Sequence, residues 1–118
     1  MKHILPLLLA ALMLFGAVNH IIKPEFYVAM IPEFIPESFA NISSAIVEAV
    51  IGIALIIPKY RKWGGLGFFL LMIAFLPIHI WDFSKEEPAI GSKNAAIIRL
   101  LVQFVFIYLG WRIWKKYE

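Results

Sequence analysis

Residues 4–22 read ILPLLLAALMLFGAVNHII, an apolar run long enough to cross a membrane. A helix needs about 20 predominantly apolar residues to span the hydrocarbon core of a bilayer. Three further stretches of the chain meet the same condition. With Lys2 counted into the first stretch, we expect helices at about 2–22, 38–57, 64–82 and 95–114. The pattern predicts an all-α fold, a membrane four-helix bundle that forms a single transmembrane domain over residues 1–118.

The composition agrees with a membrane protein and excludes several other classes. Of the 118 residues, 62% are hydrophobic and 16% are charged. A typical soluble domain has about 45–50% apolar and about 25% charged residues, and a small soluble domain needs proportionally more polar surface than a large one. The chain has no cysteine, which excludes thiol redox, haem-thiolate and iron–sulfur chemistry. The net charge of +3 fits basic loops, and we expect no nucleic-acid partner.

Prolines and charges between the four stretches predict the topology. Pro58 ends the second helix because proline cannot continue the helical hydrogen-bond ladder. The connection 59–62 is so short that the second and third helices must be antiparallel neighbours. Basic residues concentrate at both termini and in this connection, whereas most acidic residues lie in the other two connections. By the positive-inside rule, both termini of this up-down bundle are cytoplasmic.

Two segments near the N-terminus have more than one interpretation. Residues 1–3 followed by an apolar run are also typical of a signal peptide, but no cleavage site of small residues follows. We therefore expect an uncleaved first helix. The first outer loop contains PEFYVAMIPEFIP at 24–36, which is too apolar for free solution. We expect a short amphipathic segment there, which either anchors the chain at the outer interface or folds over the bundle mouth as a lid.

A few polar side chains fall inside the predicted spans, where an ionisable group is costly unless it is paired. Helical side chains lean toward the N-terminus of their helix. Side chains from the outward and inward helices should therefore converge in one layer under the outer interface. The predicted site, for a ligand or a proton relay, consists of His20, Glu48, His79, Arg99 and Gln103, with Asn19, Ser44 and Asp82 as secondary members.

Each of these residues also has a purely structural interpretation. Glu48 and Arg99 can form a buried pair that fixes the register of the helices. The two histidines can cap loops through hydrogen bonds, and Asp82 is expected at the water surface. Gln103 and Ser44 can hydrogen-bond between helices. Pro77 should kink the third helix and open space beside the polar layer.

The chemistry that these residues support is limited. No His-x-x-x-His or Glu-x-x-His spacing occurs on one helix, so we predict no metal site. Ligation of a haem by His20 and His79 is disfavoured because both lie near the outer surface. A cluster of Glu, His and Arg in a dry pocket suits proton exchange with an apolar ligand. A quinone is the one cofactor that fits, and a small lipid with one polar end fits equally well.

Short motifs along most of the chain resemble the DoxX family, a group of small bacterial four-helix membrane proteins. The matching residues are Gly16–His20, Pro24–Tyr27, Met30–Pro32, Pro36, Ser44, Glu48, Gly52, Pro58, Arg61, Ala74–Ile80, Arg99, Leu100 and Gln103. Members commonly have Asn where His79 stands here. The resemblance implies a multi-pass protein of the bacterial cytoplasmic (inner) membrane. It also implies a subunit of a membrane redox system, as in a thiosulfate:quinone oxidoreductase.

The predicted function is therefore a non-catalytic membrane subunit that binds a quinone or lipid beside a membrane or periplasmic redox protein. On this interpretation the chain is not an enzyme by itself, and its other partners are the lipid bilayer and further copies of itself. A small proton-coupled transporter is the first alternative, although such carriers place a lone Glu in the first helix. A structural scaffold without a ligand is the second alternative.

Overall fold

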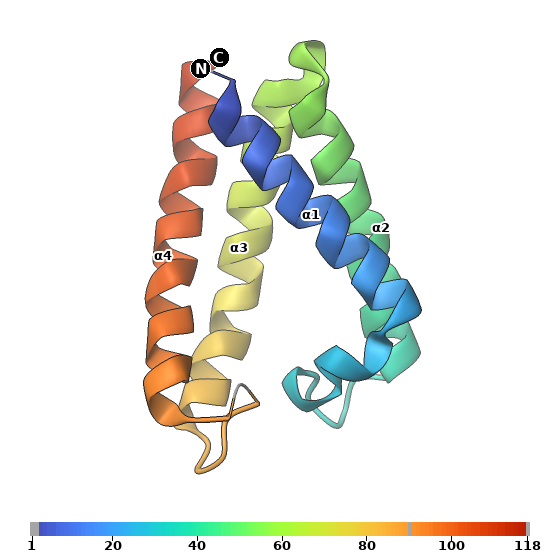
Figure 1. Ribbon diagram of the computed structural model, residues 1–118, viewed down its shortest axis with the longest axis vertical. Helices are drawn as coiled ribbons and strands as arrows, with labels where there is room; N and C mark the ends of the chain where they lie inside the picture. The colour runs from blue at the N-terminus through green and yellow to red at the C-terminus, as the bar shows by residue number, and fades with distance from the viewer. Residues whose placement is uncertain (1–2, 90, 118) are drawn as a thin grey trace.

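The computed structural model describes residues 3–89 and 91–117, which form four long helices (Figure 1). The helices are α1 (Ile4–Ile22), α2 (Glu37–Ile56), α3 (Arg61–Ser84) and α4 (Lys93–Lys116). Two short 3₁₀ helices occupy the first two connections, η1 (Pro24–Met30) and η2 (Pro58–Tyr60). The described part of the chain contains no strand. The predicted all-α class is confirmed.

The four spans lie where the apolar pattern puts them, but two helices are longer than predicted. The helix α3 begins at Arg61 and runs to Ser84, and α4 extends from Lys93 to Lys116. Lys62 therefore belongs to a helix and not to a loop. A basic residue does not end a helix, whereas Pro58 does, so the apolar pattern marks the membrane-spanning core of each helix but not its ends. The hydroxyl of Ser92 caps α4 by accepting a hydrogen bond from the Ala95 amide at 3.1 Å.

All four helices are long and apolar enough to span a membrane. Their outward surfaces carry large apolar side chains such as Phe15, Val50 and Leu101, which are more than half exposed. The longest extent of the molecule is 42 Å, close to the roughly 40–45 Å of a bilayer with its headgroup regions. These are the features of a multi-pass membrane protein.

The helices associate as two pairs, α1 with α2 and α3 with α4, and α2 contacts α3 between them. In Figure 1 the pairs meet near the chain termini and separate toward the opposite end. We call these the terminal end (His3, η2 and Tyr117) and the distal end (η1 and the α3–α4 connection). The two ends are distinguished below because they differ in packing and in chemistry.

Glycines let α3 and α4 approach closely. A Cβ atom on Gly65 would lie 2.8 Å from the Trp114 amide nitrogen, and one on Gly110 would lie 2.8 Å from the Phe69 amide nitrogen. Neither distance can be tolerated by a larger side chain without a shift of backbone. The apolar core joins both pairs and includes Leu9, Met13, Ile51, Leu55, Phe68, Met72 and Ile113.

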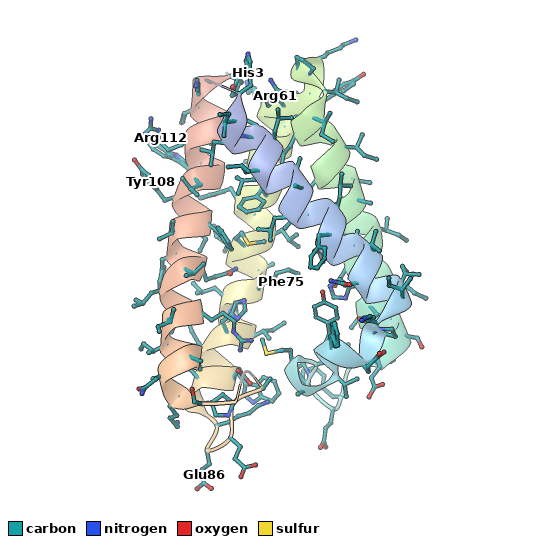
Figure 2. All side chains as sticks on the ribbon, viewed as in Figure 1. His3, Arg61, Phe75, Glu86, Tyr108 and Arg112 are labelled. Carbon is teal, nitrogen blue, oxygen red and sulfur yellow. The ribbon has the colours of Figure 1, made fainter. Side chains whose placement is uncertain are left out.

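A buried arginine closes the terminal end. Arg61 is 4% exposed, and its guanidinium donates to the Leu55 and Ile56 carbonyls, both at 2.8 Å. These carbonyls are at the end of α2, where helical partners are lacking. Nη1 of Arg61 also lies 3.0 Å from Nδ1 of His3, which in turn lies 3.0 Å from the Tyr117 hydroxyl. Figure 2 shows His3 and Arg61 together at this end. The cluster thus links the starts of α1 and α3 to the end of α4.

Candidate functional site

A cavity of about 340 Å³ lies in the distal half of the molecule and receives side chains from all four helices and from the first connection. Phe75, labelled in Figure 2, lies in the gap between the two helix pairs. We call this space the distal cavity. Its lining residues are His20, Tyr27, Met30, Ile31, Pro32, Ile35, Ala40, Ser44, Glu48, Phe75, Ile78, His79 and Arg99. Four of the five predicted site residues therefore line one space, as the leaning of helical side chains suggests.

On the α1–α2 side of the cavity, His20 is paired with Glu48. Nε2 of His20 lies 2.9 Å from Oε2 of Glu48, and both side chains are nearly buried. Gly16 makes room for this pair, because a Cβ atom there would lie 2.3 Å from Oε1 of Glu48. Glu48 therefore occupies a space that exists only because residue 16, one turn before His20, has no side chain.

The other ring nitrogen of His20 fixes how many protons this pair holds. Nδ1 of His20 lies 2.8 Å from Oδ1 of Asn41, while the amide nitrogen of Asn41 donates to the Glu37 carbonyl at 3.2 Å. The amide oxygen thus faces the ring, so Nδ1 carries a hydrogen and donates it. Nε2 and Oε2 of Glu48 lie 2.9 Å apart, which is too close for two lone pairs to face each other, so one further proton lies between them. The pair is then either imidazolium with carboxylate or imidazole with carboxylic acid, and it is neutral in both forms.

Tyr27 of η1 covers this pair from the connection side. Its ring stacks on the His20 ring with centroids 3.8 Å apart. Burial and the nearby Glu48 raise the pKa of the Tyr27 hydroxyl, and a hydrogen bond from the Asn19 side chain partly offsets the rise. Tyr27 is therefore a neutral phenol beside the cavity at physiological pH.

On the α3–α4 side, Arg99 is paired with Asp82. Nη2 of Arg99 contacts Oδ2 of Asp82, and Lys85 lies 3.1 Å from the other carboxylate oxygen. The Ala89 amide also donates to this carboxylate at 2.8 Å. Asp82 is fully buried, so the expectation that it lies at the water surface is wrong. Its three donors, one of them the backbone of the α3–α4 connection, cover the carboxylate from solvent.

The predicted Glu48–Arg99 pair does not form. Each residue finds its partner inside its own helix pair, Glu48 with His20 and Arg99 with Asp82. The reason is that α1 packs on α2 and α4 packs on α3, while the distal cavity separates the two pairs. Glu48 and Arg99 therefore line the same cavity, as predicted, but they do not contact each other across it.

Two buried nitrogen atoms beside the cavity lack a hydrogen-bond partner among the described residues. They are Nδ1 of His79 and Nε of Arg99. The second hydrogen-bond contact of Nη2 of Arg99 is with the Met30 sulfur at 3.2 Å, a weak acceptor. Buried polar groups are normally satisfied. This side of the cavity therefore has hydrogen-bonding capacity that the described chain does not use.

The remaining predicted residues have different positions. Ser44 lines the distal cavity, and Asn19 contacts Tyr27 at its edge. Gln103 is buried between α3 and α4, where its amide donates to the Met72 carbonyl at 2.8 Å. It is not among the described residues that line the cavity, and it matches the interhelical hydrogen bond considered for it.

Sequence reasoning missed three contributors to the site. Asn41 orients His20, Tyr27 stacks on it, and Met30 contacts Arg99. Asn41 carried a usable signal, because it lies seven residues before Glu48 and so on the same helical face. Tyr27 and Met30 carried none, because aromatic and thioether side chains in an apolar connection are equally typical of membrane anchoring.

The described residues contain no group of three or more His, Asp or Glu side chains that could hold a metal ion. The distal cavity instead combines a neutral His–Glu pair, an arginine with unused donors and an apolar lining. Such a mixture can hold a molecule with one polar end and one apolar end.

A family model described as Domain of unknown function (DUF8561) matches residues 9–114 of the chain. No curated protein and no solved structure is significantly similar to it. The match is not to the DoxX family, so the resemblance to that family is wrong. Its matching residues include prolines, small residues and aromatics, which many four-helix membrane proteins need for the same physical reasons. The expectation of a redox partner stays a prediction.

Proposed function

The chain belongs to the DUF8561 family, and from its cavity we propose that it is a membrane protein that binds a small amphipathic molecule, a lipid or a quinone. The observation that carries this proposal is a pair of buried nitrogen atoms without a hydrogen-bond partner, Nδ1 of His79 and Nε of Arg99, beside a cavity of about 340 Å³. Ligand pockets of about 300–1,000 Å³ with an apolar lining and a few polar groups are typical of small-molecule sites.

A scaffold without a ligand explains this arrangement less well. A polar layer that only fixes helix packing would satisfy its own donors, because each buried unsatisfied group costs about 1–3 kcal/mol. Gln103 behaves in that way, since its amide donates to the Met72 carbonyl at 2.8 Å. His79 and the Nε atom of Arg99 do not, and they lie on the side of the cavity opposite to the His–Glu pair.

Transport is also less well supported than binding. A carrier exposes its site alternately to both sides of the membrane. Here the core that includes Leu55, Phe68 and Ile113 fills the space between the distal cavity and the terminal end. Arg61 adds a second closure at that end. Opening such a path would require separation of the closely packed α3–α4 pair, so we place the ligand in a cavity that opens at the distal end only.

The first test is to identify what the protein retains when it is purified gently in a non-ionic detergent. We expect native mass spectrometry to show a bound lipid or quinone, and Glu48→Ala to lose it. Glu86→Ala is the matched control, because Glu86 is exposed in the α3–α4 connection. If no molecule co-purifies, and if added single-chain lipids and a short-chain quinone leave the unfolding temperature unchanged, the proposal is wrong.

A further inference from the structure

Arg99 is a partly buried arginine, and its buried Nε atom lacks a hydrogen-bond partner among the described residues. Of its donors, Nη2 contacts Asp82 and the Met30 sulfur, and Nε has no partner in the described chain. A thioether is a weak acceptor, whereas hydrogen bonds from arginine to a charged oxygen are about twice as strong as neutral ones. An oxygen atom supplied by a ligand would therefore be a better partner for Arg99 than Met30.

Met30 itself lines the distal cavity, at the end of η1. Its sulfur thus occupies a place beside the guanidinium that a ligand in the cavity can reach. Met is also the most adaptable of the apolar side chains, with three rotatable bonds. Displacement of the sulfur requires a rotation of this side chain and no unfolding of η1.

The charges around the cavity favour an anion. The His20–Glu48 pair is neutral in either protonation state, as its single shared proton requires. Among the described residues, Asp82 is the one acid in contact with Arg99, and it is shared with Lys85. Two cations therefore face one carboxylate, which leaves a positive charge in excess. Glu33 and Glu37 lie nearby but are exposed to solvent and do not line the distal cavity, so water screens them.

We propose that Arg99 anchors the anionic oxygen headgroup of a single-chain lipid, a carboxylate or a phosphate, which replaces the Met30 sulfur. This inference rests on the proposed function and specifies its ligand class. The headgroup lies between Arg99 and His79, with the start of the acyl chain against Phe75 and Ile78. His79 adds a second donor to the same oxygen atoms when its Nδ1 carries a hydrogen.

The test compares ligands that share one chain length and differ only in the headgroup. Dodecanoate, dodecyl phosphate, dodecanol and a dodecyl-substituted quinone are added to the protein in dodecyl maltoside, and binding is measured by native mass spectrometry and thermal shift. We expect at least one anion to bind about tenfold or more tightly than dodecanol, which corresponds to about 1.4 kcal/mol. The comparison of dodecanoate with dodecyl phosphate identifies which anionic headgroup is preferred.

Two variants separate the role of Arg99 from general packing. Met30→Leu preserves volume but removes the competing sulfur, so the affinity for the preferred anion should rise about two- to fivefold while dodecanol is unaffected. Met72→Leu is the matched control, since its sulfur contacts Gln103 in the core, and it should change neither affinity. The double variant Arg99→Gln with Asp82→Asn avoids an unpaired buried charge and should remove the preference for anions.

The outcomes distinguish this inference from the proposed function. The inference is overturned if dodecanol or the quinone binds as tightly as the anions, or if the double variant keeps the anion preference. It is also overturned if Met30→Leu weakens anion binding. In the case of quinone binding the proposed function still stands, whereas failure of all four ligands to bind, together with the absence of any co-purified molecule, would overturn both.

Discussion

At the scale of single residues, the distal cavity depends on a glycine without a side chain as much as on the polar side chains that line it. Gly16 leaves the space in which the Glu48 carboxylate lies. Asn41 sets the hydrogen on Nδ1 of His20 and so leaves one proton for Nε2 and Glu48 to share. A residue without a side chain and a neutral amide thereby control the charge state of the buried pair.

Replacement of Gly16 by Ala tests this dependence. The new methyl group would lie 2.3 Å from Oε1 of Glu48, so the carboxylate must move away from its present position. Because the obstructing atom is at the end of a flexible side chain, we expect the loss of stability to stay at or below about 1–3 kcal/mol. We expect the fraction of protein that retains the ligand, measured by native mass spectrometry, to fall strongly even though the protein stays folded.

Gly67→Ala is the control for Gly16→Ala. Its methyl group would meet Ile51 at 3.1 Å, on the α2–α3 contact and outside the distal cavity. This variant should lose a little stability and no binding. If Gly16→Ala binds the co-purified ligand as well as the parent protein does, Glu48 has no part in holding it.

At the scale of elements, the end of α2 is stabilised from outside the helix. The carbonyls of Leu55 and Ile56 receive their hydrogen bonds from Arg61, the first residue of α3. The proline that ends α2 also starts η2, so the chain turns within three residues and brings Arg61 back under the helix it has just left. One side chain thus supplies the C-terminal cap of α2 and contacts His3.

Arg61→Gln should remove most of this cap. The amide of Gln is shorter and can replace at most one of the two donors, so we expect the free energy of unfolding to fall by about 1–3 kcal/mol. Unfolding is followed by circular dichroism in mixed micelles. Lys62→Gln changes the same charge at the adjacent position and should alter stability by about 0.5 kcal/mol or less. Equal effects of the two variants would mean that charge, and not capping, explains the loss.

At the scale of the whole molecule, the two ends differ in charge. The terminal end carries Lys59, Lys62, Arg112 and Lys115 together with several aromatic rings, whereas the distal end combines Glu25, Glu33, Glu86 and Glu87 with Lys23, Lys85 and Lys93. The positive-inside rule associates a basic end with the cytoplasm. On that basis we propose that the distal cavity opens toward the outer side of the membrane.

Single cysteines can test this orientation, because the chain has none of its own. Lys59 is exposed in η2 at the terminal end, and Glu86 is exposed in the α3–α4 connection at the distal end, so Lys59→Cys and Glu86→Cys report on opposite ends. In intact cells, a membrane-impermeant maleimide should label position 86 and leave position 59 unlabelled until the membrane is opened. The reverse pattern would place the cavity on the cytoplasmic side, and labelling of both positions would exclude a fixed spanning topology.

The sequence by itself determined the number of spans, their antiparallel order and the near-absence of charge between their ends. These follow from composition and from the length of apolar runs, because a bilayer imposes its thickness on any helix that crosses it. Leaning of helical side chains also placed His20, Glu48, His79 and Arg99 around one space. The predicted helix ends were less accurate, because charged residues are compatible with both a helix and a loop.

The tertiary structure decided which polar group pairs with which. The partners of Glu48 and Arg99 depend on how α1 packs on α2 and α4 on α3. That packing is set by close contacts at glycines such as Gly16, Gly65 and Gly110, which no periodicity assigns to a particular neighbour. The partner of a polar side chain therefore depends on how two helix surfaces meet, whereas a membrane span depends on the composition of one segment. For this reason the sequence predicted the polar layer, and only the fold could show the unused donors of Arg99 and His79.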